Sequence, residues 1–305
     1  MAFIRVKKVK GLDYYYLVKS QWDPNRKVSH QLTLKYLGKA SNVTINDIPL
    51  EYRNNPRILT VLASKTKEQQ EKSFIIRELK EQVFDYLKNG DIDKIIKVAE
   101  QYKKQESLSE FYDHILKPVL YEIGNLWQQN KLDMGTEHVC SNFANKTIHI
   151  INRTIEQRNN KESILICTPE GEIHSIACNI IESVLLEKGF QTYNISPSIP
   201  SESVIAYMSN LNPSLVLISV TLLDNVGSAT RLVKKISNNS NIPIMIGGQG
   251  INNVGEDEKR NLEAINSNVK VITDSTLQTL LQTVKGSIKD SHDKKIGNYE
   301  VNLIS

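Results

Sequence analysis

The stretch "SILICTPEGEIHSIACNIIESVLLEKG", residues 163–189, decides the fold of its part of the chain. Its first five residues predict a buried strand, and its second half has the apolar spacing of a helix. Glu172 and His174 lie two residues apart in the loop between them. The residues alone leave three interpretations of this pair: a surface pair, a hydrolytic dyad, or a metal ligand with an orienting carboxylate.

The alternation of strand and helix continues to about residue 288. Further strand-like runs occur at 191–195, 214–220, 243–248 and 269–273, and helical stretches occur at 201–212, 227–238 and 275–286. This repetition predicts a parallel sheet with helices on both faces, in a domain over 160–288. Ligands of such sheets bind beyond the carboxyl ends of the strands, where the loop with His174 is expected. Residues 289–305 lack periodicity and are predicted to form a loose tail.

Two regions precede this domain. Residues 66–158 contain long amphipathic stretches, which predict a four-helix bundle. In the first of its helices the expected core stripe consists of Phe74, Ile75, Leu79, Val83 and Leu87. Residues 1–62 are rich in aromatic and β-branched residues and are broken by the turn "WDPNRK", so they predict a small antiparallel β meander. The predicted fold class is α/β plus all-α.

Composition limits the class of protein. The chain has 305 residues, of which 40% are apolar and 24% charged, the profile of a soluble globular protein. No apolar run approaches the roughly 18 residues that span a bilayer, and no apolar stretch follows the first basic residues. We therefore predict a cytoplasmic protein without a membrane partner. Cys140, Cys167 and Cys178 form no CxxC pair and are predicted to be ordinary buried thiols.

The positive charge is concentrated at the start of the chain. Residues 1–40 contain nine lysines and arginines and two aspartates, so they carry +7 and the rest carries −3 of the net +4. This asymmetry predicts a polyanion partner, with DNA the leading candidate. The alternative is the solvated face of a small β domain. The candidate DNA-binding residues are Arg5, Lys7, Lys8, Lys10, Arg26 and Lys27.

Small residues follow two other strands at the expected ligand edge. Ser219 and Thr221 come at the end of one strand, and Gly247 and Gly248 begin the turn "GGQG" after the next. Glycines there permit close approach of a ligand to the backbone. The chain has no GxSxG elbow, HExxH helix, GxGxxG turn or GxxxxGK[ST] loop in this region, which disfavours a hydrolase, a dinucleotide site and a Walker site.

The string "ICTPEGEIHSIA", with "IGGQG" further on, resembles the cobalamin-binding domain, a Rossmann-like fold with flavodoxin-type strand order. The resemblance implies that His174 is the lower axial ligand of cobalt, displacing the dimethylbenzimidazole of the cofactor, and that Glu172 orients it. Ser219, Thr221, Gly247 and Gly248 would line the slot for the displaced nucleotide tail. The chain departs from the family pattern at Ala177, where glycine is usual, and at Thr221, where leucine is usual.

The bundle carries a second resemblance. Trp127 precedes the pair Glu137–His138 with the spacing found in adenosylcobalamin-dependent photoreceptors. In that family the bundle caps the upper face of the cofactor, the tryptophan packs over the adenosyl group, and the Glu–His pair contacts its surroundings. The chain departs from the usual member at Gln128, where a histidine takes the upper cobalt position after illumination. Sequence leaves open whether His114 or His149 replaces it.

These resemblances predict an adenosylcobalamin-dependent light sensor that is not an enzyme, and that controls homo-oligomerisation, DNA binding and transcription. Residues 1–50, with "YYYLVKSQWD" and "LKYLGK", resemble the leading segment of certain insertion-sequence transposases. Two alternatives are a corrinoid carrier of a methyltransferase system, which the basic N-terminus disfavours, and a cobalamin sensor insensitive to light. A mutase subunit is disfavoured because the chain shows no substrate barrel.

Overall fold

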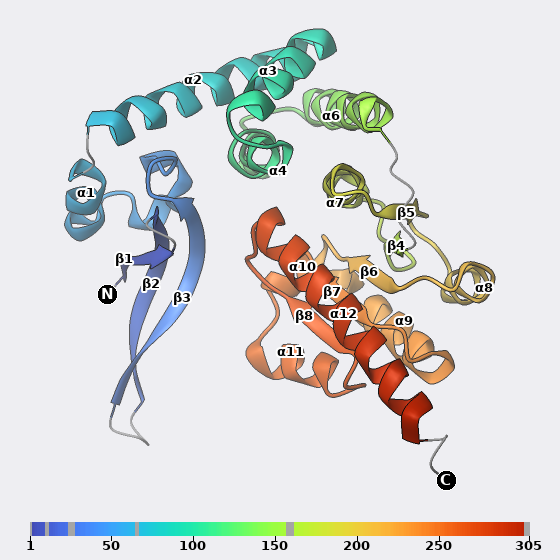
Figure 1. Ribbon diagram of the computed structural model, residues 1–305. Coiled ribbons are helices and arrows are strands. Elements are labelled where there is room, and N and C mark those ends of the chain that lie inside the picture. Colours follow the sequence, from blue (N-terminus) through green and yellow to red (C-terminus); the bar gives the residue numbers. More distant parts are fainter. Residues whose placement is uncertain (1, 10–11, 24–27, 65–66, 157–161, 302–305) are drawn as a thin grey trace. The chain divides into compact units, whose positions relative to one another are not determined.

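The computed structural model describes residues 2–9, 12–23, 28–64, 67–156 and 162–301 (Figure 1). The chain divides into two compact units, Met1–Ser141 and Asn142–Ser305. Each unit is built around its own sheet, so each is described in turn.

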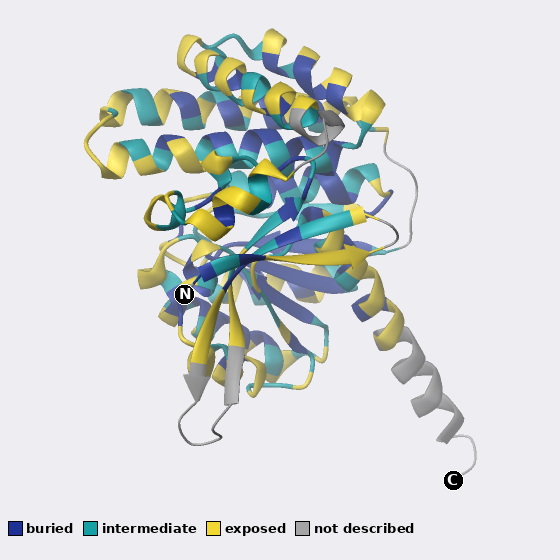
Figure 2. Ribbon diagram, turned by 90° about the vertical axis from the view of Figure 1, so that its left-hand side faces the viewer, coloured by how far each residue is buried: buried dark blue, intermediate teal, exposed yellow. Residues whose placement is uncertain are grey.

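The first unit begins with a three-stranded antiparallel sheet of order β1-β2-β3. Its strands are β1 (Ala2–Val9), β2 (Leu12–Asp23) and β3 (Val28–Lys39), which confirms the predicted meander. The inner end of the sheet is buried, with Ile4 and Leu17 packed in a cluster that includes Ile58 of α1 (Pro56–Ala63). Two short 3₁₀ helices, η1 (Ile45–Asp47) and η2 (Leu50–Tyr52), lead into α1. The outer half of β1 is exposed, as Figure 2 shows.

Four long helical stretches follow. They are α2 (Lys67–Asn89), α3 (Ile92–Gln105), the continuous run of α4 (Leu108–Phe111), η3 (Tyr112–Leu116) and α5 (Lys117–Gln128), and finally α6 (Met134–Thr154). The η3 turn is π-helical, and the amide of Lys117 bonds to the carbonyl of Tyr112, five residues back. Pro118 explains the wider turn, because it has no amide hydrogen for the carbonyl of His114. With the two sheets, these helices confirm the predicted fold class.

The core stripe of α2 differs from the prediction. Ile76, Val83 and Leu87 are buried, whereas Phe74 and Ile75 are more than half exposed. The buried residues repeat at intervals of seven and four, which keeps them on one helix face, and the predicted stripe began one or two residues too early. The guanidinium of Arg77 lies 5.0 Å from the centroid of the exposed Phe74 ring, a cation–π distance.

The second unit contains a five-stranded parallel sheet of order β5-β4-β6-β7-β8. The strands are β4 (Ser163–Cys167), β5 (Gln191–Asn194), β6 (Leu215–Ser219), β7 (Ile244–Gly247) and β8 (Val269–Ile272). This is the flavodoxin-type order that was predicted. β4 and β6 are buried along their whole length, as expected for central strands covered on both faces. The strand order reverses between them, so the switch point lies at their carboxyl ends.

Helices follow each strand of this sheet. They are α7 (Ile176–Glu187), α8 (Ser201–Leu211), η4 (Leu223–Asn225) with α9 (Val226–Asn239), α10 (Gln249–Asn252), α11 (Glu256–Glu263) and α12 (Leu277–Val301). The loose tail predicted from residue 289 is instead helical as far as Val301. The segment contains no proline, so nothing in its backbone chemistry ends α12 earlier. Within the described ranges, no helix combines the length and the apolar character needed to cross a bilayer.

Candidate functional site

Glu172 and His174 face each other in the loop that follows β4. The Nδ1 atom of His174 donates a hydrogen bond to Oε1 of Glu172 at 2.5 Å, and the amide of His174 donates to the same oxygen at 3.1 Å. The side chain of Glu172 is fully buried, whereas that of His174 is 45% exposed. With its proton on Nδ1, the imidazole carries its lone pair on Nε2, the tautomer that can coordinate a metal.

The second oxygen of Glu172 is held by the loop that follows β6. Oε2 accepts hydrogen bonds from the amides of Thr221 and Leu222, both at 2.9 Å, and from Nδ2 of Asn225 at 3.0 Å. Burial alone would raise the pKa of Glu172. The hydrogen bonds from His174, Leu222 and Asn225 outweigh it and lower this pKa to about 2. The carboxylate is therefore a permanently ionised acceptor for His174.

Asn225 is a site residue that sequence reasoning missed. It lies 53 residues beyond Glu172, at the end of η4, and the sheet brings the two together. Its position in the second loop at the ligand edge was the available signal, since a short amide there can donate to a carboxylate in the first loop. Thr221 was predicted for its hydroxyl group, but it contacts Glu172 through its backbone amide.

The glycine turn after β7 packs against the same loop. Gly248 has a φ of 114°, and a Cβ there would lie 2.4 Å from the carbonyl oxygen of Val220. A Cβ at Gly250 would lie 2.8 Å from the carbonyl oxygen of Leu222, and the amide of Gly250 donates to Val220 at 3.0 Å. These glycines therefore support the backbone segment that holds Glu172, a role distinct from the predicted close approach to a ligand.

The interior behind the switch point contains small polar groups and thiols. Ser219, at the end of β6, is 5% exposed, and Cys167 and Cys178 are fully buried. Burial raises the pKa of Cys178 to about 12 and raises that of Cys167 further, so both stay protonated at neutral pH. Cys140 is also free and buried. The prediction of three ordinary buried thiols is confirmed.

The candidate residues of the bundle lie in the first unit. Trp127, near the end of α5, is 41% exposed. Glu137 accepts a hydrogen bond from the hydroxyl of Ser141 at 2.7 Å and pairs with Nδ1 of the adjacent His138. These polar contacts are all within α6, and the roles assigned to the three residues stay predictions.

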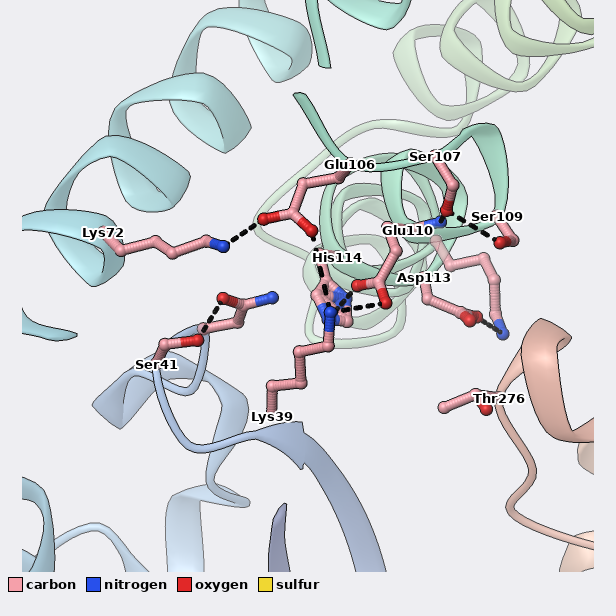
Figure 3. A network of polar contacts seen from close by, with 12 residues as sticks. Lys39, Ser41, Lys72, Glu106, Ser107, Ser109, Glu110, Asp113, His114 and Thr276 are labelled. Atoms are coloured by element: carbon pink, nitrogen blue, oxygen red, sulfur yellow. Dashed lines mark hydrogen bonds and ion pairs between the residues drawn. The ribbon is translucent and has the colours of Figure 1, made fainter. Parts of the chain in front are cut away.

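A network of charges joins the N-terminal sheet to the helices of the first unit. Figure 3 shows Lys39, at the end of β3, between Glu110 and Glu106, with Lys72 also paired with Glu106. The Nζ atom of Lys39 lies 2.9 Å from Glu110 and 3.6 Å from Glu106. A second ion pair, between Lys80 of α2 and Asp47, measures 2.8 Å. The N-terminal sheet is thus fixed to the helices by partly buried charges.

His114 lies in the same junction. Its ring is 3.8 Å from the position that a Cβ on Gly38 would occupy, and its Nε2 is 3.1 Å from Glu110. Burial lowers the pKa of His114 to about 4, with Lys80 and Lys39 adding to the effect. This histidine is therefore neutral at physiological pH and belongs to the contact between sheet and helices. His149, the other candidate, is exposed on α6.

The candidate DNA-binding cations are only partly described. Arg5, Lys7 and Lys8 lie on the exposed half of β1, and Arg5 donates to the side chain of Gln31 at 3.2 Å. Lys10, Arg26 and Lys27 lie outside the described residues.

The second unit has the features of a cofactor-binding domain. Its open parallel sheet reverses strand order between β4 and β6 and presents there an imidazole backed by a buried carboxylate. Such a donor fits a metal that needs one further axial nitrogen ligand, because the carboxylate fixes the ring and raises the basicity of Nε2. The fold and the site thus define a protein that binds a metal-containing cofactor beyond the carboxyl ends of the strands.

Comparison with known proteins identifies that cofactor. Residues 162–266 match a family model described as a B12 binding domain, and residues 79–152 match a second B12 binding domain model. The chain belongs to the cobalamin-binding proteins, and its cofactor is cobalamin with its cobalt, as predicted.

Two curated relatives illustrate the likeness. The chain is 19% identical to dimethylamine corrinoid protein 2 of Methanosarcina acetivorans over 177 residues, which cover 56% of this chain and 82% of the relative. It is 24% identical to the trimethylamine corrinoid protein of Methanosarcina barkeri over 135 residues, or 42% and 62% of the two chains. The structure of the M. barkeri monomethylamine corrinoid protein has a TM-score of 0.54 at 12% identity, over 70% of this chain and 98% of that one, which supports the fold.

The light-sensor prediction is wrong. The relatives and the solved structure described above are methylamine corrinoid proteins, which favours the carrier alternative instead. Control of transcription was predicted as the output of that sensor and loses its support with it. DNA binding was predicted also from the charge of residues 1–40, and the comparisons give it no support. The adenosyl form of the cofactor also rested on the photoreceptor resemblance. Both family models match residues beyond 78, so the transposase resemblance of residues 1–50 stays untested.

Proposed function

We propose that this chain is a corrinoid carrier protein of a methyltransferase system. The observation that carries the proposal is the His174–Glu172 pair at the switch point of a B12-binding domain, in a chain whose relatives are dimethylamine and trimethylamine corrinoid proteins. When bound, the corrin supplies a cobalt that accepts a methyl group from one partner and passes it to another.

In this proposal His174 would hold the cobalt of the cofactor through Nε2. Glu172 holds the ring by its Nδ1 proton and, with five hydrogen bonds to its carboxylate, stays fixed and charged. A permanently charged acceptor increases the electron density on Nε2 and makes it a better ligand. The half-exposed ring and the buried carboxylate suit these two roles, because the ligand must reach the cofactor while its support excludes water.

The other candidate residues receive binding roles in the same proposal. Ser219, Thr221, Gly247 and Gly248 would line the slot for the nucleotide tail, close to the loop that supports Glu172. Trp127, Glu137 and His138 would contribute further contacts to the bound cofactor. Trp127 offers a large apolar wall that excludes water, and the Glu137–His138 pair offers polar groups for a bound ligand.

The proposed partners are methyltransferases, with a methylated amine as the class of methyl donor. The carrier itself would catalyse no reaction, in line with the prediction that the chain is not an enzyme. Self-association of copies of this chain stays a separate prediction that the carrier role does not require.

A transfer assay tests the proposal. The protein is loaded with cobalamin, reduced, methylated with ¹⁴C-methyl iodide and mixed with clarified extract of its own cells. The label should leave the protein and the spectrum of the unmethylated corrin should return, while boiled extract should leave the label in place. Equal retention of label with fresh and boiled extract, in darkness, would contradict the carrier role. His174→Ala, loaded in the same way, shows whether transfer depends on the proposed ligand.

A further inference from the structure

We propose that a chain of side-chain hydrogen bonds from α6 to the loop 168–174 positions His174, with Asn194 as its central positioning residue. The inference rests on the ligand role of His174 in the proposed function. Every residue of this hydrogen-bond chain lies in the second unit of the protein.

The chain begins on the C-terminal half of α6. Oδ1 of Asn145 accepts a hydrogen bond from Nδ2 of Asn179 on α7 at 2.9 Å. Oδ1 of Asn179 in turn accepts from Nδ2 of Asn194 at 2.8 Å. Asn179 is only 4% exposed, so loss of either partner would leave a buried polar group unsatisfied. These two bonds connect α6 to the carboxyl end of β5 through α7.

Asn194 uses both ends of its amide. Its Nδ2 also donates to Oε2 of Glu182 at 3.1 Å, and its Oδ1 accepts from the amide and the hydroxyl of Ser196 at 3.2 and 2.7 Å. The orientation of the amide is therefore fixed by donors on one side and acceptors on the other. Aspartate at this position would keep the contacts with Ser196, but it would lose the donor and place a second negative charge beside Glu182.

The loop after β5 connects Asn194 to the site, because Ser198 in this loop bonds to the loop 168–174. The amide of Ser198 donates to the carbonyl of Glu172 at 2.9 Å and to the hydroxyl of Thr168 at 2.8 Å. The hydroxyl of Ser198 accepts from the amide of Gly171 at 3.0 Å. Ser198 has a left-handed φ of 47°, which a non-glycine residue adopts at a free-energy cost and keeps only when its surroundings hold it there. Ser198 is thus held by contacts on both sides of the Glu172 backbone.

A parallel connection strengthens the attachment of α6 to α7. Asn152 of α6 accepts from the hydroxyl of Ser183, which is fully buried, and donates to Oε2 of Glu182 at 3.5 Å. Oε2 of Glu182 therefore accepts hydrogen bonds from both Asn152 of α6 and Asn194 of β5. The N-terminal part of α6 carries Glu137 and His138, so one helix bears these candidate cofactor contacts and the start of the hydrogen-bond chain that ends at His174.

The test measures ligation by His174 directly. The wild type and each variant are labelled with ¹⁵N-histidine, loaded with unlabelled cobalamin and reduced to the Co(II) state. The fraction with the two-line superhyperfine splitting of a ¹⁵N ligand is then measured by electron paramagnetic resonance. Asn194→Asp should shift the equilibrium towards the unligated histidine by about tenfold, the lower range for loss of an outer partner of a metal ligand. The double variant Asn194→Asp/Glu182→Gln should recover only part of the ligated fraction. The amide introduced at position 182 can donate to the carboxylate introduced at position 194 without adding charge, but the bond from position 194 to Asn179 stays broken.

The controls separate positioning from general stability. Asn239→Ala removes a 2.8 Å amide bond to the carbonyl of Lys235 at the end of α9, outside the chain, and should leave the ligated fraction unchanged. Asn145→Ala removes the outer end, which is only half-buried, and decides the question if Asn194→Asp fails to fold. A wild-type ligated fraction in Asn194→Asp, or in Asn145→Ala where the former is unfolded, would overturn the proposal. Absence of the two-line splitting in the labelled wild type would instead contradict the ligand role of His174.

Discussion

Nδ1 of His174 lies 2.5 Å from Oε1 of Glu172, and the two side chains differ completely in exposure, 45% against 0%. The imidazole is thus open to solvent, while the carboxylate that holds it is inside the protein. The support is itself held from the next loop by two amides and Asn225. We therefore expect the proposed ligation of cobalt by His174 to depend on two loops that are far apart in sequence.

Glu172→Gln should weaken cobalamin binding by about 10- to 100-fold, the usual range for loss of an outer partner of a metal ligand. The amide retains the size of the side chain but lacks the charge that orients the imidazole. Titration with hydroxocobalamin, followed by absorbance, measures the dissociation constant. Glu170→Gln changes an exposed carboxylate of the same loop and should bind as the wild type does. Equal cobalamin affinity of the two variants would show that Glu172 does not contribute to cobalamin binding.

Gly248→Ala should destabilise the protein by several kcal/mol, because the new methyl group would meet the carbonyl oxygen of Val220 at 2.4 Å in a backbone conformation with φ of 114°. It should also weaken cobalamin binding, since the displaced loop holds Glu172. Gly255→Ala is the matched control, because its Cβ would meet nothing within 4 Å. Denaturant unfolding and the same titration measure both effects. Equal stability of the two variants would show that the turn does not constrain the loop.

Lys39→Met should lower the free energy of unfolding by about 1–3 kcal/mol, because it removes the cation that lies 2.9 Å from the partly buried Glu110 and leaves Glu106 with Lys72 alone. Lys94→Met removes an exposed ion pair with Asp91 and should cost less than about 1 kcal/mol. Urea unfolding of the two variants gives the comparison. Similar small losses would mean that the Lys39 network does not join the N-terminal sheet to the helices.

Acid should weaken the first unit through His114. Its pKa in the folded protein is lowered to about 4, below the ordinary value near 6.5, so the unfolded chain takes up a proton first as the pH falls. Above about pH 6.5 protonation of His114 does not affect the free energy of unfolding. Between about pH 6.5 and pH 4 it lowers this free energy by up to about 3 kcal/mol. Unfolding free energies of the wild type and His114→Phe between pH 4 and 7.5 test this. Parallel pH profiles would show that His114 contributes none of the dependence.

Much of the fold could be predicted from the sequence, because the signals are local. Apolar runs such as "SLVLISV" at 214–220, alternating with helical stretches, indicate buried parallel strands, and the meander follows from its turn and its alternation. The stripe on α2 was misplaced because Phe74 and Ile75 are apolar yet lie beside the core face. The end of α12 was missed because the tail has little apolar periodicity, although it contains no proline.

The site could be predicted only in part. Glu172 and His174 are two residues apart, so their pairing can be predicted from the sequence. Asn225 reaches Glu172 only because β4 packs beside β6. The function was mispredicted for a physical reason as well. The spacing of Trp127 and Glu137–His138 fixes no chemistry by itself, since the described polar contacts of Glu137 are with Ser141 and His138 on its own helix.

The ligand role of His174 is tested most directly by labelling the histidines of the protein with ¹⁵N. Protein labelled with ¹⁵N-histidine is loaded with unlabelled cobalamin, reduced to the Co(II) state and measured by electron paramagnetic resonance. Because ¹⁵N has spin one half and ¹⁴N has spin one, we predict two-line superhyperfine splitting in the labelled protein and its loss in His174→Ala. Three-line splitting in the labelled wild type would show that the cofactor keeps its own benzimidazole on cobalt and would contradict the account.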